Sequence, residues 1–104
     1  MAEITISFLY FDDCPLAARA RDNLMNALER VRRCMMIGFE EVDIMDPLTP
    51  EPLKRWGSPT ILIDGMDITG APQGAACNCR IYPGDGNVPT IDEIVDALVR
   101  RVKP

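Results

Sequence analysis

The chain has 104 residues and a formal net charge of −5, which predicts one compact domain and disfavours nucleic acids and anionic membranes as partners. It contains no histidine, so histidine-based catalytic triads and zinc sites are excluded, and cysteine becomes the side chain best suited to chemistry near neutral pH. The apolar runs are too short for a transmembrane helix, and the N-terminus lacks the basic start of a signal peptide. We therefore expect a cytoplasmic protein whose four cysteines are not structural disulfides.

The first half of the chain predicts a strand and then a long helix. Residues 3–11 alternate and then become wholly apolar, as in a buried central strand. From Leu16 the apolar residues recur every three or four positions, which predicts a helix over about residues 15–35, ended by Gly38. Cys34 falls on this apolar stripe and is expected to be a buried structural cysteine. The stripe consists of Ala17, Ala20, Leu24, Ala27, Leu28, Val31 and Met35.

Shorter elements follow. Apolar residues around 39–44 indicate a second strand, and residues 53–56 a short helix that Gly57 closes. Residues 59–64 form a clear third strand, from which a hairpin turn leads to a short return strand over 67–69.

The last third of the chain combines a loop with a helix. Residues 70–89 are rich in glycine and proline and predict a loop. Thr90 and Glu93 form a capping box, which opens a final helix with an apolar stripe. The predicted element order is therefore βαβαββα. The stripe consists of Ile91, Ile94, Val95, Leu98 and Val102.

Three short motifs, together with this order of elements, are typical of a known family. They are Cys14-Pro15 after the first strand, Gly57-Ser58-Pro59-Thr60 before the third, and Asp64-Gly65 with Gly70 near the return strand. With them the chain resembles the thioredoxin-like superfamily, close in length to the glutaredoxins, over nearly all of its length except residues 70–89. The resemblance implies a single thioredoxin-like α/β domain over residues 1–104, with a central mixed four-stranded sheet flanked by helices. It also implies that Pro59 is cis and packs beside a reactive cysteine.

A narrower resemblance concerns small bacterial thioredoxin-like proteins labelled as related to alkylmercury lyase. The shared features are the Cys14-Pro15 start, the Gly-Ser-Pro-Thr strand entry, and a late Cys79-Arg80 before Tyr82. This resemblance implies an affinity for soft metals such as mercury.

Cys14 is the cysteine placed best for chemistry. It lies between the first strand and the first helix, where backbone N–H groups and the helix dipole favour a thiolate. Pro15 suits the first helical position, which makes Cys14 the expected N-cap; alternatively, Asp13 is the N-cap and Cys14 an ordinary neighbour. The anions Asp12 and Asp13 oppose a thiolate, while Arg19 and Arg21 could offset part of this effect.

Cys14 has no partner in its own motif, because Ala17 occupies the position of the second cysteine in a Cys-x-x-Cys dithiol. The return strand runs antiparallel to the third strand and ends near Cys14, so the loop carrying Cys77 and Cys79 must leave from there. Chain direction thus predicts that these two cysteines approach Cys14. A loop of this length is also more often functional than a short connection.

Three functions remain open from the sequence. The first is thiol–disulfide exchange, with Cys14 as the attacking thiol and Cys79, or else Cys77, or glutathione, as the resolving thiol. In that case a thiol or disulfide substrate, small molecule or protein, would dock along Ser58, Pro59 and Thr60 by strand-like pairing, with Tyr10 lining the pocket. No cofactor is required for this reaction.

The second function is capture of Hg(II), Cu(I), As(III) or Zn(II) by Cys14, Cys77 and Cys79. The third is a thioredoxin-like adaptor that binds a partner and performs no chemistry.

Overall fold

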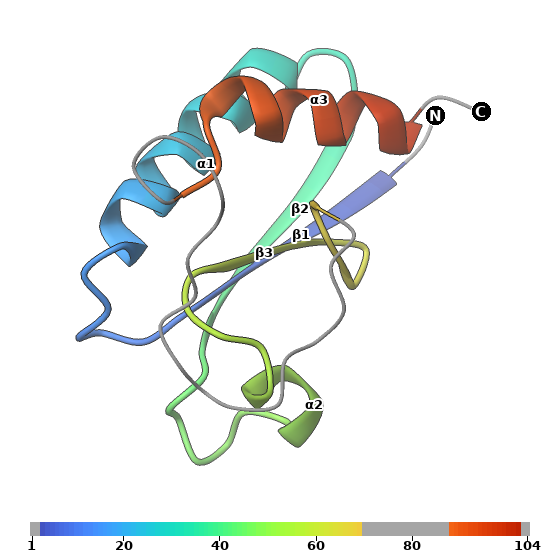
Figure 1. The fold of residues 1–104 in the computed structure, drawn as a ribbon. Coiled ribbons are helices and arrows are strands. Elements are labelled where there is room, and N and C mark those ends of the chain that lie inside the picture. Colours follow the sequence, from blue (N-terminus) through green and yellow to red (C-terminus); the bar gives the residue numbers. More distant parts are fainter. Residues whose placement is uncertain (1–2, 70–87, 103–104) are drawn as a thin grey trace.

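The computed structural model describes residues 3–69 and 88–102, and it confirms the predicted order βαβαββα (Figure 1). The chain begins with β1 (Glu3–Tyr10), continues through α1 (Ala17–Val31) into β2 (Met36–Asp43), and then forms the short α2 (Glu51–Lys54). The hairpin of β3 (Thr60–Ile63) and β4 (Met66–Asp67) follows, and α3 (Ile91–Val102) ends the described part.

The four strands form one mixed sheet in the order β2-β1-β3-β4. β1 pairs parallel with β2 and antiparallel with β3, and β4 pairs antiparallel with β3. In this register Tyr10 lies opposite Asp43, and Leu9 lies opposite Thr60. The ends of β1 and β2 and the beginning of β3 therefore meet at the same edge of the sheet, and the connection that carries Cys14 leaves from this edge.

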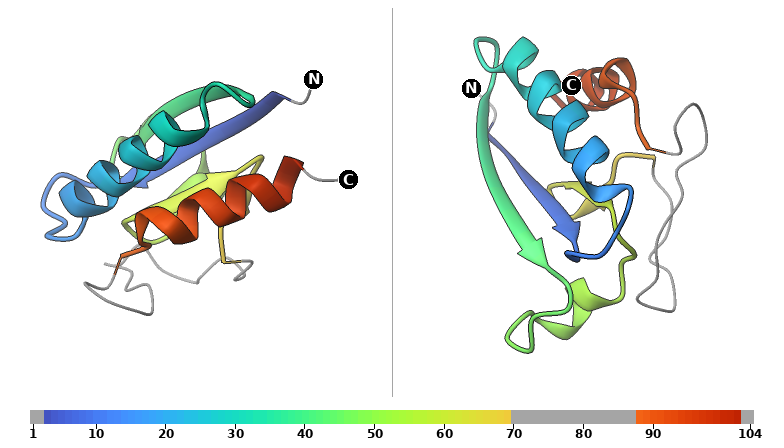
Figure 2. Two further views of the ribbon diagram at one scale, coloured as in Figure 1. Left: turned by 90° about the horizontal axis from the view of Figure 1, so that it is seen from above. Right: turned by 90° about the vertical axis from the view of Figure 1, so that its left-hand side faces the viewer.

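Helices α1 and α3 lie side by side over one face of the sheet (Figures 1 and 2). Successive side chains of a strand point to opposite faces, and Ile4, Ile6 and Phe8 of β1 point toward these two helices. This face holds the larger part of the hydrophobic core. The buried residues that α1 and α3 contribute to it are Ala20, Leu24, Ala27, Val31, Ile94, Ala97 and Leu98.

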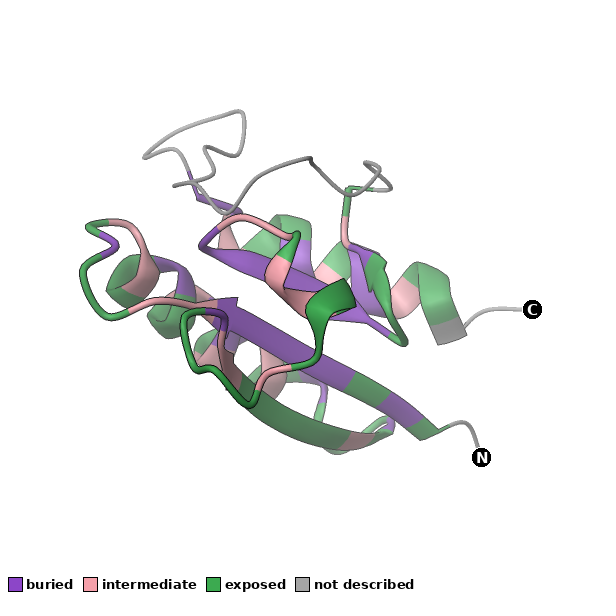
Figure 3. Cartoon of the chain, turned by 90° about the horizontal axis from the view of Figure 1, so that it is seen from below, coloured by how far each residue is buried: buried purple, intermediate pink, exposed green. Residues whose placement is uncertain are grey.

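A smaller apolar cluster lies on the opposite face. Leu9, Ile44 and Leu62 are buried there, and Leu53 at α2 and Trp56 pack against them. Figure 3 shows β1 and β3 largely buried, whereas the edge strand β2 is mostly exposed. Among residues 3–69 and 88–102, none of the helices combines the length and apolar character that a membrane-crossing segment needs.

The β3–β4 hairpin turns at Asp64 and Gly65, whose φ angles are 51° and 85°. Asp and Gly tolerate this left-handed region better than other residues, which is why Asp-Gly forms tight hairpins. After the turn the chain runs back along β3, since Ile68 N–H donates to the carbonyl of Ile61 at 3.2 Å. The predicted direction of this return is thus confirmed as far as Ile68. The strand itself covers Met66–Asp67 instead of the predicted 67–69, because the turn falls at Asp64 and Gly65, one residue earlier than predicted.

The predicted extent of the first helix was wrong at both ends. α1 covers Ala17–Val31 rather than residues 15–35. At its end Arg32 N–H still bonds to Leu28, but Cys34 N–H donates to Val31 at 2.8 Å, in a turn outside the helix. Because helical spacing no longer decides which way side chains point, Cys34 is exposed, and the prediction of a buried structural cysteine was wrong.

Other boundaries moved by two or three residues. Gly38 lies within β2 and does not end the helix, and β2 begins at Met36, ahead of the predicted 39–44. The short helix α2 begins at Glu51 instead of residue 53. Its Pro52 is tolerated because N–H groups in the first turn of a helix have no intrahelical acceptor.

The capping box at the start of α3 is confirmed. Thr90 N–H donates to Glu93 Oε1 at 3.0 Å, and Glu93 N–H donates to Thr90 Oγ1 at 3.1 Å. Two N–H groups without a helical acceptor are satisfied by these reciprocal bonds.

Candidate functional site

The connection from β1 to α1 consists of two consecutive turns that meet at Cys14. Cys14 N–H donates to the carbonyl of Phe11 at 3.1 Å, and Ala17 N–H donates to the carbonyl of Cys14 at 3.3 Å. Pro15 occupies the second position of the latter turn, which its fixed φ also suits. The residue at the N-cap is Leu16, with no side-chain hydrogen bond, so the predicted N-cap at Cys14 and its alternative at Asp13 were both wrong.

The Cys14 side chain points inward, against the loop that precedes β3. It is buried, with 6% exposure, and its Sγ donates to the carbonyl oxygen of Ser58 at 3.4 Å. Ser58 Oγ in turn accepts the N–H of Phe11 at 3.3 Å. The Ser58–Pro59 peptide bond is cis, as the thioredoxin-like resemblance implied. Two hydrogen bonds therefore fix Cys14 and the Pro59 loop next to each other, although they are far apart in sequence.

Ser58, Pro59 and Thr60 are all buried. Thr60 Oγ1 donates to the carbonyl of Gly57 at 2.5 Å, which closes the loop on itself. The side chains of Ser58 and Thr60 thus hold the loop in place. Docking of a substrate along the backbone of this loop stays a prediction.

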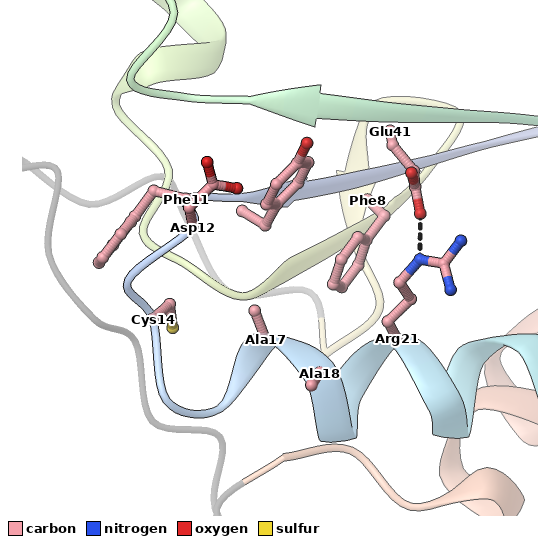
Figure 4. Close-up of a pocket in the computed structure, with 9 residues that line it drawn as sticks. Phe8, Phe11, Asp12, Cys14, Ala17, Ala18, Arg21 and Glu41 are labelled. Atoms are coloured by element: carbon pink, nitrogen blue, oxygen red, sulfur yellow. Dashed lines mark hydrogen bonds and ion pairs between the residues drawn. The ribbon is translucent and has the colours of Figure 1, made fainter.

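Cys14 lines a pocket of about 250 Å³ between the start of α1 and the sheet. In Figure 4, Cys14 and Phe11 lie at one end and the pair of Arg21 and Glu41 at the other, with Ala17 between them. The pocket therefore joins a thiol to a polar end through an apolar middle. Its lining consists of Phe8, Tyr10, Phe11, Asp12, Cys14, Ala17, Ala18, Arg21 and Glu41.

The polar end of the pocket is held by an ion pair between Arg21 Nε and Glu41 Oε1. The sequence suggested that Arg21 would offset the acidic residues beside Cys14, but in the structure it pairs with Glu41 on β2. Burial, and after it the carboxylates of Asp43, Asp12 and Glu41, raise the pKa of Tyr10, with Arg21 acting against them. The carboxylates outweigh the single guanidinium at this tyrosine.

The sequence predicted Tyr10 beside Cys14 but gave no sign that Phe8, Phe11, Ala18 and Glu41 would line the same pocket. Ala18 and Arg21 lie three positions apart on α1 and therefore on one side of the helix, but Cys14 lies outside the helix, so helical spacing could not have joined it to them. Glu41 carried no such signal, because its place opposite Phe8 follows from the register of the parallel β1–β2 pair.

The other cysteines do not join this site within the part of the chain that the structure describes. Cys34 lies beyond the opposite end of α1. Cys77 and Cys79, the predicted resolving thiols and metal ligands, lie outside the described residues. Residues 3–69 and 88–102 contain no cluster of three or more cysteine, aspartate or glutamate side chains suited to hold a metal ion. Capture of a soft metal would accordingly depend on Cys77 and Cys79.

No family model matches the chain, and comparisons with curated proteins and with solved structures found no significant similarity. The function must therefore be inferred from the site itself, together with the short motifs that the sequence displays.

Proposed function

We propose that this protein is a thioredoxin-like protein that exchanges disulfides through Cys14. The observation that carries the proposal is the position of the Cys14 sulfur. It lies at the junction of β1 and α1, in a pocket, and 3.4 Å from the carbonyl oxygen of Ser58 in the loop before β3. A cysteine that lines a small cavity at such a junction can be reached by a small substrate, which a wholly enclosed packing residue cannot.

The arrangement of the sheet supports the same proposal. A parallel β1–β2 pair and an antiparallel β3–β4 hairpin, joined in the order β2-β1-β3-β4, agree with a thioredoxin-like fold. The start of α1 lies close to Cys14, since Ala17 N–H donates to the Cys14 carbonyl oxygen at 3.3 Å, and it brings the positive end of the helix dipole to this region. No side chain caps this helix start, in contrast to α3.

In the proposed reaction the Cys14 sulfur leaves its hydrogen bond to Ser58 and attacks one sulfur of a disulfide R–S–S–R. A bond forms between Cys14 and R–S, while the second R–S leaves as a thiolate and takes up a proton. A second thiol then attacks the mixed disulfide. Glutathione attacks the R sulfur, forms a glutathione–R disulfide and releases Cys14 in its reduced form. Cys79, or else Cys77, instead attacks the Cys14 sulfur, forms a disulfide with Cys14 and expels the remaining R–S as a thiolate, which takes up a proton.

The test is to expose the reduced protein to glutathione disulfide, trap the remaining thiols with N-ethylmaleimide, and map the products by mass spectrometry. We expect either a glutathione adduct on Cys14 or a disulfide from Cys14 to Cys79 or Cys77. Cys14→Ser should abolish both products. Cys34→Ser, which removes an exposed cysteine far from the pocket, should preserve them and serves as the matched control.

The proposal fails if Cys14 of the folded protein forms none of these disulfides while an unfolded sample does. That result would favour the non-catalytic adaptor, because the thiol would be intact but closed to exchange.

A further inference from the structure

The pocket beside Cys14 has a defined shape. Ala17 and Ala18 face it from α1, and their small side chains leave open the space that larger residues would fill. Across from them the rings of Phe8 and Tyr10 stack with centroids 5.9 Å apart and an interplanar angle of 12°. A volume of about 250 Å³ lies below the usual range for drug-sized ligands, which begins at about 300 Å³. The pocket therefore suits a small ligand.

The charges around this pocket are mostly negative. Its lining includes the carboxylates of Asp12 and Glu41 and the guanidinium of Arg21, which is paired with Glu41. Asp12 also lines an adjoining hollow together with Asp13 and Asp43. Four carboxylates and one guanidinium therefore lie around the pocket.

The pKa of Tyr10 reflects the same charges. Its pKa is raised first by burial and then by Asp43, Asp12 and Glu41, against a smaller opposing effect of Arg21. The carboxylates that disfavour the negatively charged phenolate of Tyr10 would favour a positively charged ammonium group in the pocket.

We propose that the substrate taken by Cys14 is a small disulfide bearing an amine, such as cystamine. This inference rests on the proposed exchange function and adds the substrate class. The aminoethyl arm would occupy the apolar middle of the pocket between Ala17 and the Phe8–Tyr10 stack. Its ammonium group would lie in the field of Asp12 and Glu41, within the screening length of about 8 Å at physiological ionic strength.

The step balances as an exchange. Cys14 sulfur bonds to one sulfur of cystamine, the cystamine S–S bond breaks, and one cysteamine leaves as a thiolate that takes up the proton released by Cys14. The other half stays on Cys14 as a mixed disulfide that carries one positive charge.

The experiment compares three disulfides of similar length: cationic cystamine, neutral 2-hydroxyethyl disulfide and anionic 3,3′-dithiodipropionate. Initial rates of mixed-disulfide formation at Cys14 are measured in the Cys34→Ser protein. They are divided by the rates with the neutral model thiol N-acetylcysteinamide, which removes the intrinsic reactivity of each disulfide. We expect the normalised rate for cystamine to exceed that for dithiodipropionate by about tenfold at low salt, and the ratio to shrink as salt is added.

Variants distinguish the effect of the pocket carboxylates on the cystamine preference from the effect of the net charge of the whole chain. Asp12→Asn and Glu41→Gln should each reduce the cystamine preference severalfold. Asp92→Asn is the matched control, because it removes one negative charge from an exposed position on α3, where Asp92 pairs with Arg30. It should leave the preference unchanged, and an equal reduction in Asp92→Asn would overturn the assignment to the pocket.

The two proposals fail in different ways. If none of the three disulfides modifies Cys14, the exchange function is wrong. If all three modify it with equal normalised rates, or if the anionic one is fastest, exchange stands and the amine preference is wrong.

Discussion

The two long helices begin in opposite ways. α3 begins at a reciprocal capping box, in which Thr90 and Glu93 satisfy each other's N–H groups. α1 begins at Ala17, and its N-cap residue Leu16 makes no capping side-chain hydrogen bond and has a helical φ and ψ of −96° and −11°. The uncapped helix is the one that lies beside the candidate site. Because the start of α1 has no side-chain cap, the stability of this helix must come from its buried face, and the residues around its start line the pocket instead.

The largest expected effect concerns that buried face. Leu24 is 0% exposed at the centre of α1, and Leu24→Ala should lower the free energy of unfolding by about 3 kcal/mol through lost burial and the cavity left behind. The measurement is urea unfolding followed by circular dichroism. Leu28→Ala, at a half-buried position of the same helix, should cost clearly less. Equal costs would mean that α1 does not depend on its core face.

The capping box of α3 gives the next effect. Thr90→Ala should destabilise the protein by about 1 kcal/mol, because Glu93 N–H loses its acceptor. Thr90→Ser keeps the hydroxyl and should retain most of the stability. A Thr90→Ala protein as stable as the parent would remove the contrast between the two helix starts.

Adding a capping side chain at the start of α1 should destabilise the protein instead of stabilising it. Leu16→Ser supplies a capping side chain, but an N-cap residue normally adopts a β conformation, and Leu16 does not. The variant also loses the packing of Leu16 against the core, so we expect a loss of roughly 0.5–1 kcal/mol. Thermal unfolding measures it, and a gain in stability would show that capping had been available at this end.

The smallest effect is confined to alkaline pH. The pKa of Tyr10 is raised above 10.0 by burial and by Asp43, Asp12 and Glu41, so the neutral phenol is favoured in the folded state. Its contribution to stability is fully present below pH 10 and is lost as pH rises through the folded pKa. In a Tyr82→Phe protein, where Tyr10 is the only tyrosine, phenolate absorbance should appear above pH 10. Asp43→Asn should shift this titration downward, and a midpoint at or below 10 in the Tyr82→Phe protein would contradict the acidic character of the pocket.

Much of the fold could be predicted because local patterns determine it. The order of elements follows from the apolar strand 3–11, the helical stripes and the turn signal around Gly65, each of which depends on neighbours close in sequence. The same holds for the start of α3, whose cap needs only Thr90 and Glu93. Cys14 could be singled out because the absence of histidine left few chemical groups and the change of period located the junction.

Other features could not be read from the sequence. Pro15 suits both a helix start and a turn, and the turn was formed, which moved the helix start from residue 15 to Ala17. Cys34 fits the helical spacing of the apolar stripe, but the helix ends at Val31. Beyond that point the spacing no longer predicts which side chains are buried, and Cys34 is exposed.

Local patterns in the chain are enough to predict which elements form, in what order, and that a single cysteine follows the first strand. The residues around that cysteine depend instead on how the strands pair. The carbonyl of Ser58 reaches it through the antiparallel β1–β3 pair, and Glu41 reaches Arg21 through the parallel register of β1 and β2. Periodicity and capping depend on residues a few positions apart, so they can be recognised in the sequence. Strand pairing brings together residues that are distant in sequence, and no local pattern indicates which of them will meet.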